Sequence, residues 1–405
     1  MSYEELLGQI FRRFPSVQSA AFADAYKPGL GRMRKFARLL GNPQEKYRTI
    51  HVAGTNGKGS VSSMLASCLM AKGCRTGLYT SPHLVDFRER MKVDGQLPPK
   101  EWVQDFLQTH WETFDRLDLS FFEITTGMAF KWFEEQKCDV AVVEVGLGGR
   151  LDSTNIITPE LSIITSIGLD HCAYLGDTLQ DIAAEKAGIF KAGIPAVIGE
   201  VLPETLRVFL EKAKGPLYFA ENNKTPLPDG MDLRGACQKK NFATVLTALE
   251  VLGIEPDMEA IKHTAQRTGL RGRWEILRDN PLIICDIGHN AAALGPNFAQ
   301  LESLGRPLTI IYAVMADKDL GAIIPLMPRG AKYIFVSPKT PRALPAEQIL
   351  QRVASWRGSS EGLLAIPDIP QAIAHALKTS APEDVIYIGG STFAVTEALQ
   401  YFEGL

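Results

Sequence analysis

Short apolar runs alternate along this chain with longer segments in which apolar residues recur every three or four positions. A short apolar run is typical of a buried strand, and the longer spacing is typical of a helix. In the first part of the chain, predicted strands begin near residues 48, 75, 139 and 161, and clear helical patterns cover 100–116, 122–136 and 239–253. This alternation favours an α/β fold with a mostly parallel sheet.

The alternation becomes more regular from residue 281 onward. The predicted strands are LIICDIG, LTIIYAV, YIFVS, LLAIP and VIYIGG, and the predicted helices cover 290–304, the residues after DKDL, 345–355, 368–378 and 391–402. This part resembles a smaller Rossmann-like α/β domain, but it lacks the GxGxxG fingerprint, so nothing favours NAD. We therefore predict a P-loop-type ATPase domain over 1–272 and a C-terminal domain over 281–405, joined by a hinge rich in glycine and arginine.

The length and charge of the chain exclude some classes of protein. A chain of 405 residues is too long for one compact core, which also favours two domains. With 43 basic and 46 acidic residues, the net charge is −3, so no overall field attracts nucleic acid or membrane. No stretch approaches the ~20 apolar residues of a membrane span, and the six cysteines form no CxxC pair. We expect a monomeric cytoplasmic protein with small-molecule substrates.

The stretch RTIHVAGTNGKGS at 48–60 places a glycine-rich turn between a strand and a helix. Such a turn directs backbone N–H groups and the positive end of a helix toward an anion. Lys58 adds a charge, and Ser60 adds a hydroxyl group for a metal bound to phosphate. The stretch departs from the GxxxxGK[ST] pattern at Val52 and Gly59, yet together these groups predict a nucleotide triphosphate site.

Polar side chains end the next predicted strands. Ser81 follows the second strand, Glu144 ends the third, and Asp170 with His171 follows the fourth. Ligands bind at the carboxyl ends of strands in open α/β sheets, and a buried carboxylate requires a cation or hydrogen-bond donors. These residues are therefore candidates for binding Mg²⁺. The basic segment 24–48 is left open between a solvated helix face and a binding site for an acidic substrate.

Several separated motifs resemble folylpolyglutamate synthase and the bifunctional dihydrofolate synthase/folylpolyglutamate synthase, a family within the Mur ligase superfamily. In chain order they are GTNGKGS, TSPH, EVGLGGRLDSTN, SIGLDHCAYLGDTL, EKAGIFK, LRGRWE, DIGHN and DKD. The resemblance implies ATP-dependent amide bond formation, in which a carboxylate of dihydropteroate or a folate is phosphorylated and then attacked by the amine of L-glutamate.

The resemblance also implies roles for individual residues. ATP would contact Thr55, Asn56, Gly57, Lys58, Gly59, Ser60, Asn241, Arg273 and Asp286. One Mg²⁺ would be held by Ser81 and Glu144, and a second by His171, positioned by a carbamylated Lys186. Glutamate would contact His289 and Ser391. The pterin or folate would lie against Lys27, Pro28, Gly29, Leu30, Ser120, Phe121, Phe122, Glu123, Leu151, Asp152 and Ser153. The residues implied to take part in the chemistry are Lys58, His171, Lys186 and His289.

Two alternatives remain open from the sequence. A peptidoglycan Mur-type ligase would also form an amide with ATP, but its acid substrate would be a nucleotide-linked peptide. The sequence GKGS, where that enzyme would have GKT, argues against it. A P-loop ATPase with a protein partner would not form an amide. It would hydrolyse ATP without acid or glutamate, whereas a ligase would need both.

Overall fold

The computed structural model describes residues 2–14 and 27–404. Its contacts divide the chain into two compact units, one of residues 1–232 with 238–270 and one of 233–237 with 271–405. The division falls close to the predicted end of the first domain at 272. It also assigns residues 233–237 to the second unit, which the sequence pattern did not separate.

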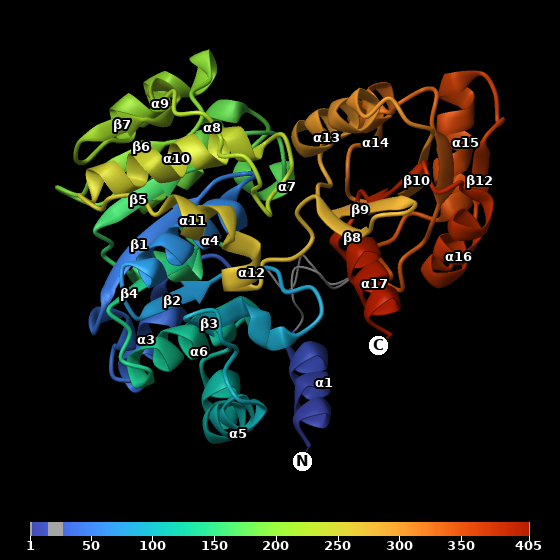
Figure 1. Ribbon diagram of the computed structural model, residues 1–405. Coiled ribbons are helices and arrows are strands. Elements are labelled where there is room, and N and C mark those ends of the chain that lie inside the picture. The colour runs from blue at the N-terminus through green and yellow to red at the C-terminus, as the bar shows by residue number, and fades with distance from the viewer. Residues whose placement is uncertain (1, 15–26, 405) are drawn as a thin grey trace. The chain divides into compact units, whose positions relative to one another are not determined.

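The first unit is built on a seven-stranded sheet with the order β3-β2-β4-β1-β5-β6-β7 (Figure 1). All neighbouring strands are parallel except β2 and β3. The strands are β1 (Arg48–Ala53), β2 (Thr76–Tyr79), β3 (Met91–Val93), β4 (Val140–Glu144), β5 (Leu161–Ile164), β6 (Ala196–Ile198) and β7 (Leu217–Phe219).

The helices of the first unit cover both faces of this sheet. They are α1 (Tyr3–Arg13), α3 (Gly31–Leu39), α4 (Lys58–Ala71), α5 (Lys100–Arg116), α6 (Phe121–Glu135), α7 (Cys172–Leu175), α8 (Leu179–Lys186), α9 (Pro203–Lys212), α10 (Gln238–Val251), α11 (Met258–Lys262) and α12 (Thr264–Thr268). Short 3-10 helices include η2 (Phe87–Arg90) and η3 (Ser153–Ile156).

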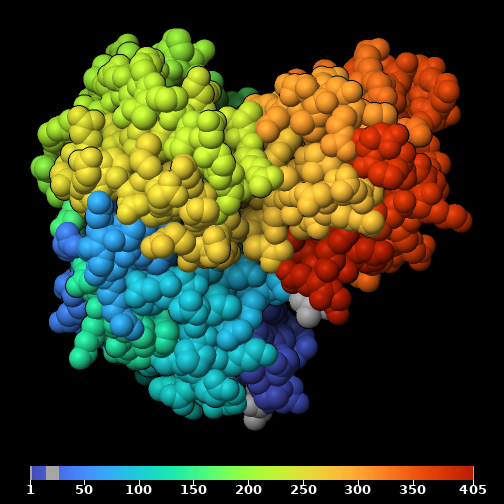
Figure 2. Space-filling model, viewed as in Figure 1, coloured from blue at the N-terminus to red at the C-terminus, as the bar shows by residue number. Residues whose placement is uncertain are grey.

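Helix α4 lies between the sheet and a second layer of helices. It contacts β1, β2 and β4 on one side and α10, α11 and α12 on the other. Residues 59–69 are consequently all buried, including the serines among them. Figure 2 shows the atoms of α10 to α12, in yellow, forming the outer surface over this part of the unit.

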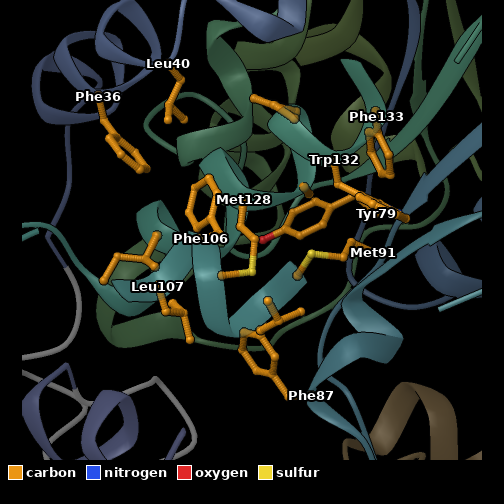
Figure 3. Close-up of a cluster of buried hydrophobic side chains, with 14 of the residues drawn as sticks. Phe36, Leu40, Tyr79, Phe87, Met91, Phe106, Leu107, Met128, Trp132 and Phe133 are labelled. Atoms are coloured by element: carbon orange, nitrogen blue, oxygen red, sulfur yellow. The ribbon is translucent and has the colours of Figure 1, made fainter. Parts of the chain in front are cut away.

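The opposite face of β2 and β4 packs against α6 and α5. Tyr79, Ala141 and Val143 point into this core because alternate residues of a strand share a face. Figure 3 shows Tyr79 and Met91 among Met128, Phe106 and Phe133. An added Cβ at Gly77 would lie 2.8 Å from the Phe133 ring, so α6 packs directly on the strand backbone.

The second unit contains a six-stranded sheet with the order β12-β11-β10-β13-β9-β8, in which only β8 is antiparallel to its neighbour. Its strands are β8 (Glu275–Arg278), β9 (Leu282–Asp286), β10 (Leu308–Tyr312), β11 (Lys332–Phe335), β12 (Leu363–Ala365) and β13 (Val385–Gly389). Its helices are α13 (Ala291–Ser303), α14 (Leu320–Ile323), α15 (Ala346–Arg357), α16 (Ile369–Thr379) and α17 (Thr392–Glu403). The predicted fold class, two α/β units with mostly parallel sheets, is confirmed.

One predicted helix of the second unit is short. The segment after DKDL forms only α14, which passes into a 3-10 turn at Ile324–Leu326. Pro325 lies in this turn and cannot donate a backbone hydrogen bond, so the α-helix does not continue. No helix in residues 2–14 and 27–404 is both long and apolar enough to cross a membrane.

Candidate active site

Four neighbouring parallel strands of the first unit end at the same edge of its sheet. Residue pairing aligns Val52 of β1 with Glu144 of β4, and Tyr79 of β2 with Val143. It also aligns Ala53 of β1 with Ile164 of β5. The glycine turn, Ser81, Glu144 and the segment that leads to His171 therefore all follow strand ends on one edge, where α/β proteins bind ligands.

The glycine turn is held by the segment after β5. The Thr55 N–H donates to the Ser166 carbonyl oxygen over 2.8 Å, and the Asn56 N–H donates to Ser166 Oγ over 3.1 Å. Thr165 Oγ1 donates to the Asn56 carbonyl oxygen over 2.6 Å. An added Cβ at Gly54 would lie only 1.9 Å from Thr165 Oγ1, so only glycine fits this close approach. The sequence analysis missed Thr165 and Ser166 because their contact with the turn depends on strand order.

Lys58 opens helix α4, and its ammonium group lies within the turn. Nζ donates to the carbonyl oxygens of Gly54, over 3.0 Å, and Thr55, over 3.2 Å. The preceding residue, Gly57, has φ 86°, and no side chain caps the helix N-terminus. Uncapped N–H groups beside a lysine form a positive site suited to phosphate.

Asn241 and Ser60 lie beside this turn in the same unit. An added Cβ at Gly57 would lie 2.4 Å from Asn241 Oδ1, so the asparagine packs closely on the turn. Asn241 Nδ2 donates to Gln238 Oε1 over 2.9 Å, and Gln238 Nε2 donates to Ser60 Oγ over 3.3 Å. Gln238, which the sequence analysis did not single out, therefore connects the two predicted ATP contacts.

Lys186 reaches the glycine turn from α8. Its side chain is only 5% exposed, and Nζ donates to the Gly54 carbonyl oxygen over 3.0 Å. Burial, reinforced by the nearby charge of Lys58, lowers the pKa of Lys186 to about 7. A considerable fraction of this amine is therefore neutral at neutral pH.

Ser81 and Glu144, which the sequence analysis assigns to one metal ion, lie next to each other; their role as metal ligands stays a prediction. The Ser81 N–H donates to Glu144 Oε2 over 3.2 Å, and Glu144 is 3% exposed. A carboxylate and a hydroxyl oxygen are donors that suit Mg²⁺, which usually binds one or two carboxylates and completes its shell with water and phosphate. The described residues contain no group of three or more His, Cys, Asp or Glu side chains that could hold a metal ion.

His171 lies at the start of α7 with a left-handed backbone, φ 53°. Its N–H donates to Asp170 Oδ1 over 2.9 Å, and its Nε2 lies 4.0 Å from the same oxygen. The residue thus follows the same sheet edge as Glu144, with Asp170 as a close acidic neighbour. Its role in holding a second metal stays a prediction.

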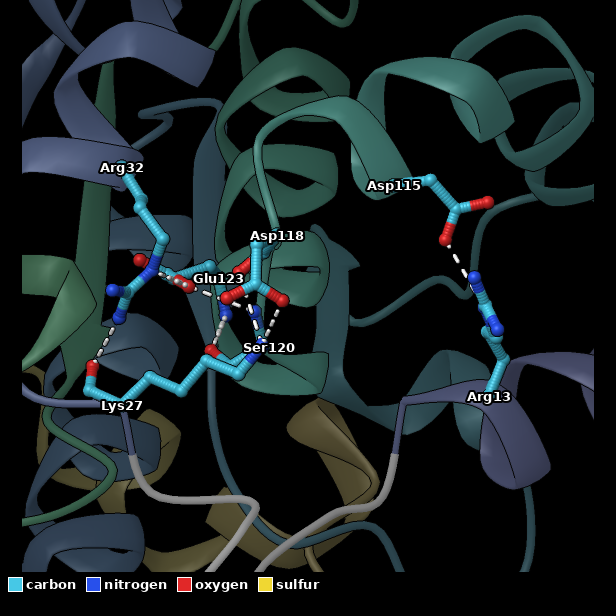
Figure 4. A network of polar contacts seen from close by, with 7 residues as sticks. All are labelled: Arg13, Lys27, Arg32, Asp115, Asp118, Ser120 and Glu123. Carbon is cyan, nitrogen blue, oxygen red and sulfur yellow. Dashed lines mark hydrogen bonds and ion pairs between the residues drawn. The ribbon is translucent and has the colours of Figure 1, made fainter.

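Two segments predicted to hold the acid substrate lie together in Figure 4. Lys27 Nζ forms an ion pair with Asp118 and also donates to its carbonyl oxygen over 3.1 Å. Arg32 donates to Glu123 Oε2 over 3.2 Å and to the Lys27 carbonyl oxygen over 2.6 Å. The Ser120 N–H also donates to Glu123 Oε2, over 2.8 Å. Arg32 thus joins the loop at Lys27–Leu30 to the start of α6.

The third substrate segment, 151–153, is organised by Asp152. Its Oδ2 accepts from the N–H groups of Gly146 and Leu147, and its Oδ1 accepts from the N–H and hydroxyl of Thr154. Helix α6 contacts the adjacent η3, so this segment lies beside the other two. Burial raises the pKa of Asp152, and these donors oppose the shift. Asp152 fixes the glycine loop that follows Glu144, while its predicted contact with substrate stays a prediction.

A hydrogen-bonded pair that the sequence analysis did not predict, partly exposed His83 and buried Arg90, follows Ser81. Arg90 is 3% exposed, and its Nε donates to His83 Nδ1 over 2.7 Å. The Arg90 guanidinium also lies 5.0 Å from the centroid of the Phe121 ring. The histidine belongs to the motif TSPH, but its arginine partner lies beyond a loop and carries no local signal.

In the second unit, Asp286 ends β9, His289 follows it, and Ser391 follows the neighbouring strand β13. Asp286 accepts from the N–H groups of Trp274, over 2.9 Å, and Gly288, over 2.7 Å, so it fixes the backbone next to Arg273. Burial raises the pKa of Asp286.

His289 Nδ1 lies 3.0 Å from the Ile287 carbonyl oxygen, and Ser391 Oγ accepts from the Phe393 N–H at the start of α17. The two predicted glutamate contacts therefore share one edge of this sheet.

Two family models match separate parts of this chain. Residues 52–200 match the model of the Mur ligase middle domain, and residues 272–392 match that of the Mur ligase glutamate ligase domain. Folylpolyglutamate synthase of Lacticaseibacillus casei is 32% identical over 92% of this chain and 94% of its own. Dihydrofolate synthase/folylpolyglutamate synthase of Bacillus subtilis is 36% identical over 80% of this chain and 84% of its own.

Solved structures show the same fold. The structure of E. coli FolC in complex with DHPP and ADP matches with a TM-score of 0.85 and 28% identity, covering 100% of this chain and 98% of that chain. The bifunctional folylpolyglutamate synthase/dihydrofolate synthase of Yersinia pestis, complexed with AMPPNP and Mn ion, matches with a TM-score of 0.83, 28% identity and the same coverage. The identity and coverage of these relatives show that the chain belongs to the folylpolyglutamate synthase/dihydrofolate synthase family of Mur ligases.

Proposed function

We propose that this chain is an ATP-dependent ligase that joins L-glutamate to the carboxyl group of dihydropteroate, of folates, or of both. The observation that carries the proposal is the single sheet edge that gathers the glycine turn with Lys58, the buried amine of Lys186 and the Ser81–Glu144 pair. The family relatives are named for reactions of pteridine acids, which favours these acids over the nucleotide-linked peptide of a peptidoglycan ligase.

Different residues of the chain would serve the successive steps of this reaction. The N–H groups of the turn and Lys58 would bind the triphosphate, and Ser81 and Glu144 would hold Mg²⁺. When bound, this ion would neutralise charge on the phosphoryl group during transfer. The substrate carboxylate attacks the γ-phosphorus of ATP, ADP leaves, and an acyl phosphate forms. The neutral amine of glutamate, which His289 and Ser391 would contact, then attacks the acyl carbon. Phosphate leaves, and the nitrogen loses a proton as the amide forms.

Two finer features belong to the same proposal. Lys186 carries a carbamate, which forms only from a neutral amine, and its pKa of about 7 supplies that form at neutral pH. His171 then contributes to a second divalent ion. Carbon-13 NMR of protein equilibrated with ¹³C-bicarbonate should show a carbamate signal that is lost in Lys186→Met. Cytoplasmic location and a monomeric state stay predictions from the sequence.

The decisive experiment is a product assay. The protein is incubated with ATP, Mg²⁺, glutamate and either dihydropteroate or tetrahydrofolate, and the products are weighed by mass spectrometry. We expect a mass increase of one glutamate residue and little ATP hydrolysis until both the acid and glutamate are present. Rapid ATP hydrolysis without either one, and no glutamate adduct, would refute the proposal.

A further inference from the structure

Several hydrogen bonds organise the loop between β2 and β3 around His83. Glu89 accepts three backbone hydrogen bonds, from Leu84 over 2.8 Å, Val85 over 2.9 Å and Asp86 over 2.7 Å. Arg90 holds the His83 ring from the other side over 2.7 Å. The position of this imidazole is therefore set by two neighbouring residues of its own loop.

The hydrogen bond with Arg90 also fixes which ring nitrogen carries a proton. A guanidinium group has no acceptor, so His83 Nδ1 must accept and cannot be protonated. The single ring proton of His83 therefore lies on Nε2. In the part of the chain that the structure describes, Nε2 has no hydrogen-bond partner, and it is not one of the enclosed unpaired atoms. His83 is a partly exposed residue, so this N–H donor lies on a side chain that is not enclosed.

The surroundings of this donor are aromatic. The His83 ring lies 6.0 Å from the Phe11 ring and 5.9 Å from the Phe87 ring, and Phe11 lies 5.4 Å from Phe121. Phe11 is 38% exposed, which is unusual for an aromatic side chain in such a cluster. Phe87 and Phe121 are buried, so Phe11 is the exposed ring of this cluster. Aromatic side chains beside one oriented polar donor are typical of a site for a flat, largely apolar ligand.

We propose that His83 Nε2–H donates a hydrogen bond to an acceptor on the pteridine acid, with Arg90 as the residue that positions the ring. This inference rests on the function proposed above. The acid is favoured over ATP because Phe121 opens α6, next to the segment that Arg32 joins to the loop at Lys27–Leu30. The triphosphate site is built from other segments, at 54–60, 165–168 and 238–241.

The test compares His83→Asn with His83→Gln. An asparagine amide can occupy the position of Nδ1 and keep a partner for Arg90, but it cannot reach the position of Nε2. A glutamine amide can reach that position and donate there. We expect H83N to raise the KM for dihydropteroate about tenfold, as for one lost hydrogen bond of about 1.4 kcal/mol, and to leave the KM for ATP within about twofold. H83Q should recover most of this loss.

Three results would overturn the inference: an unchanged KM for dihydropteroate in H83N, an equal rise in both KM values, or a larger loss in H83Q than in H83N. Equilibrium binding of the nonhydrolysable analogue AMPPNP checks that each variant is folded, and if H83N does not fold, H83Q must keep the KM for dihydropteroate within about threefold. Failure of the proposed function is distinguishable, because the wild-type protein would then form no glutamate adduct. Equilibrium binding of dihydropteroate to the wild type and to H83N would still decide the role of His83.

Discussion

The buried amine of Lys186 makes the stability of the protein depend on pH. Its pKa is about 7 in the folded protein and about 10.4 in an unfolded chain, so between these values the unfolded state binds more protons. Stability from this group therefore rises as the pH increases from 7 to 10. Below pH 7 both states are protonated, and the folded state bears the full cost of a buried charge.

We expect Lys186→Met to be more stable than the wild type near pH 6, by on the order of 4 kcal/mol, with the difference shrinking toward pH 10. Urea unfolding in CO₂-free buffer at several pH values measures this difference. Lys72→Met is the matched control, because Lys72 is exposed and its replacement should leave the pH profile unchanged. A constant difference between K186M and wild type across this range would contradict the shifted pKa.

A substitution at Glu144 can test metal binding without loss of the fold. Glu144→Gln keeps an oxygen to accept the Ser81 N–H but removes the charge that attracts Mg²⁺. We expect product formation to fall at least about 100-fold, while the midpoint of thermal unfolding without nucleotide does not decrease. Activity and Mn²⁺ binding, followed by electron paramagnetic resonance, measure the effect. Near-normal activity in E144Q would remove Glu144 from the metal site.

At the scale of elements, two glycines at opposite ends of α4 allow backbone strain to be separated from function. Gly57 and Gly73 have φ values of 86° and 82°, a region that costs an alanine about 1 kcal/mol. An added Cβ at Gly57 would meet Asn241 Oδ1 at 2.4 Å, whereas nothing lies within 4 Å of one at Gly73.

We therefore expect Gly57→Ala and Gly73→Ala to cost similar backbone energy, with only G57A weakening the binding of AMPPNP, by at least about tenfold. The clash would displace Asn241 and the start of α4, where the phosphates are expected to bind. Isothermal titration calorimetry and thermal unfolding of both variants give the two quantities. Equal AMPPNP affinities in the two variants would show that the turn tolerates a side chain.

The sequence predicted elements and local motifs well, but not contacts between distant segments. The turn at 54–60 and the strand ending in Glu144 carry their signal in adjacent residues. The bond between Lys186 and Gly54 joins residues 132 positions apart and became a contact only once β1, β4 and β5 were neighbours. The backbone hydrogen bonds of Asp152 could not be predicted either. In a sequence, an acidic loop residue that binds the backbone cannot be told from one that binds substrate.

At the scale of the whole molecule, each unit has its own sheet and its own apolar core. A chain of two such units need not unfold in one step. All the contacts described around the glycine turn come from the first unit, so a ligand at the turn should stabilise that unit first. At a concentration 100 times its Kd, AMPPNP with Mg²⁺ should add about 2.7 kcal/mol to the unfolding free energy of the unit that binds it.

Hydrogen exchange resolved by peptide measures this directly. With AMPPNP and Mg²⁺, amides of β1, β4 and β5 that exchange by global unfolding of their unit should slow about 100-fold, while those of β10 and β11 should slow only severalfold. Lys58→Met, which loses the phosphate contact, is the control in which neither sheet should respond. Equal slowing in both sheets would mean that the units unfold together.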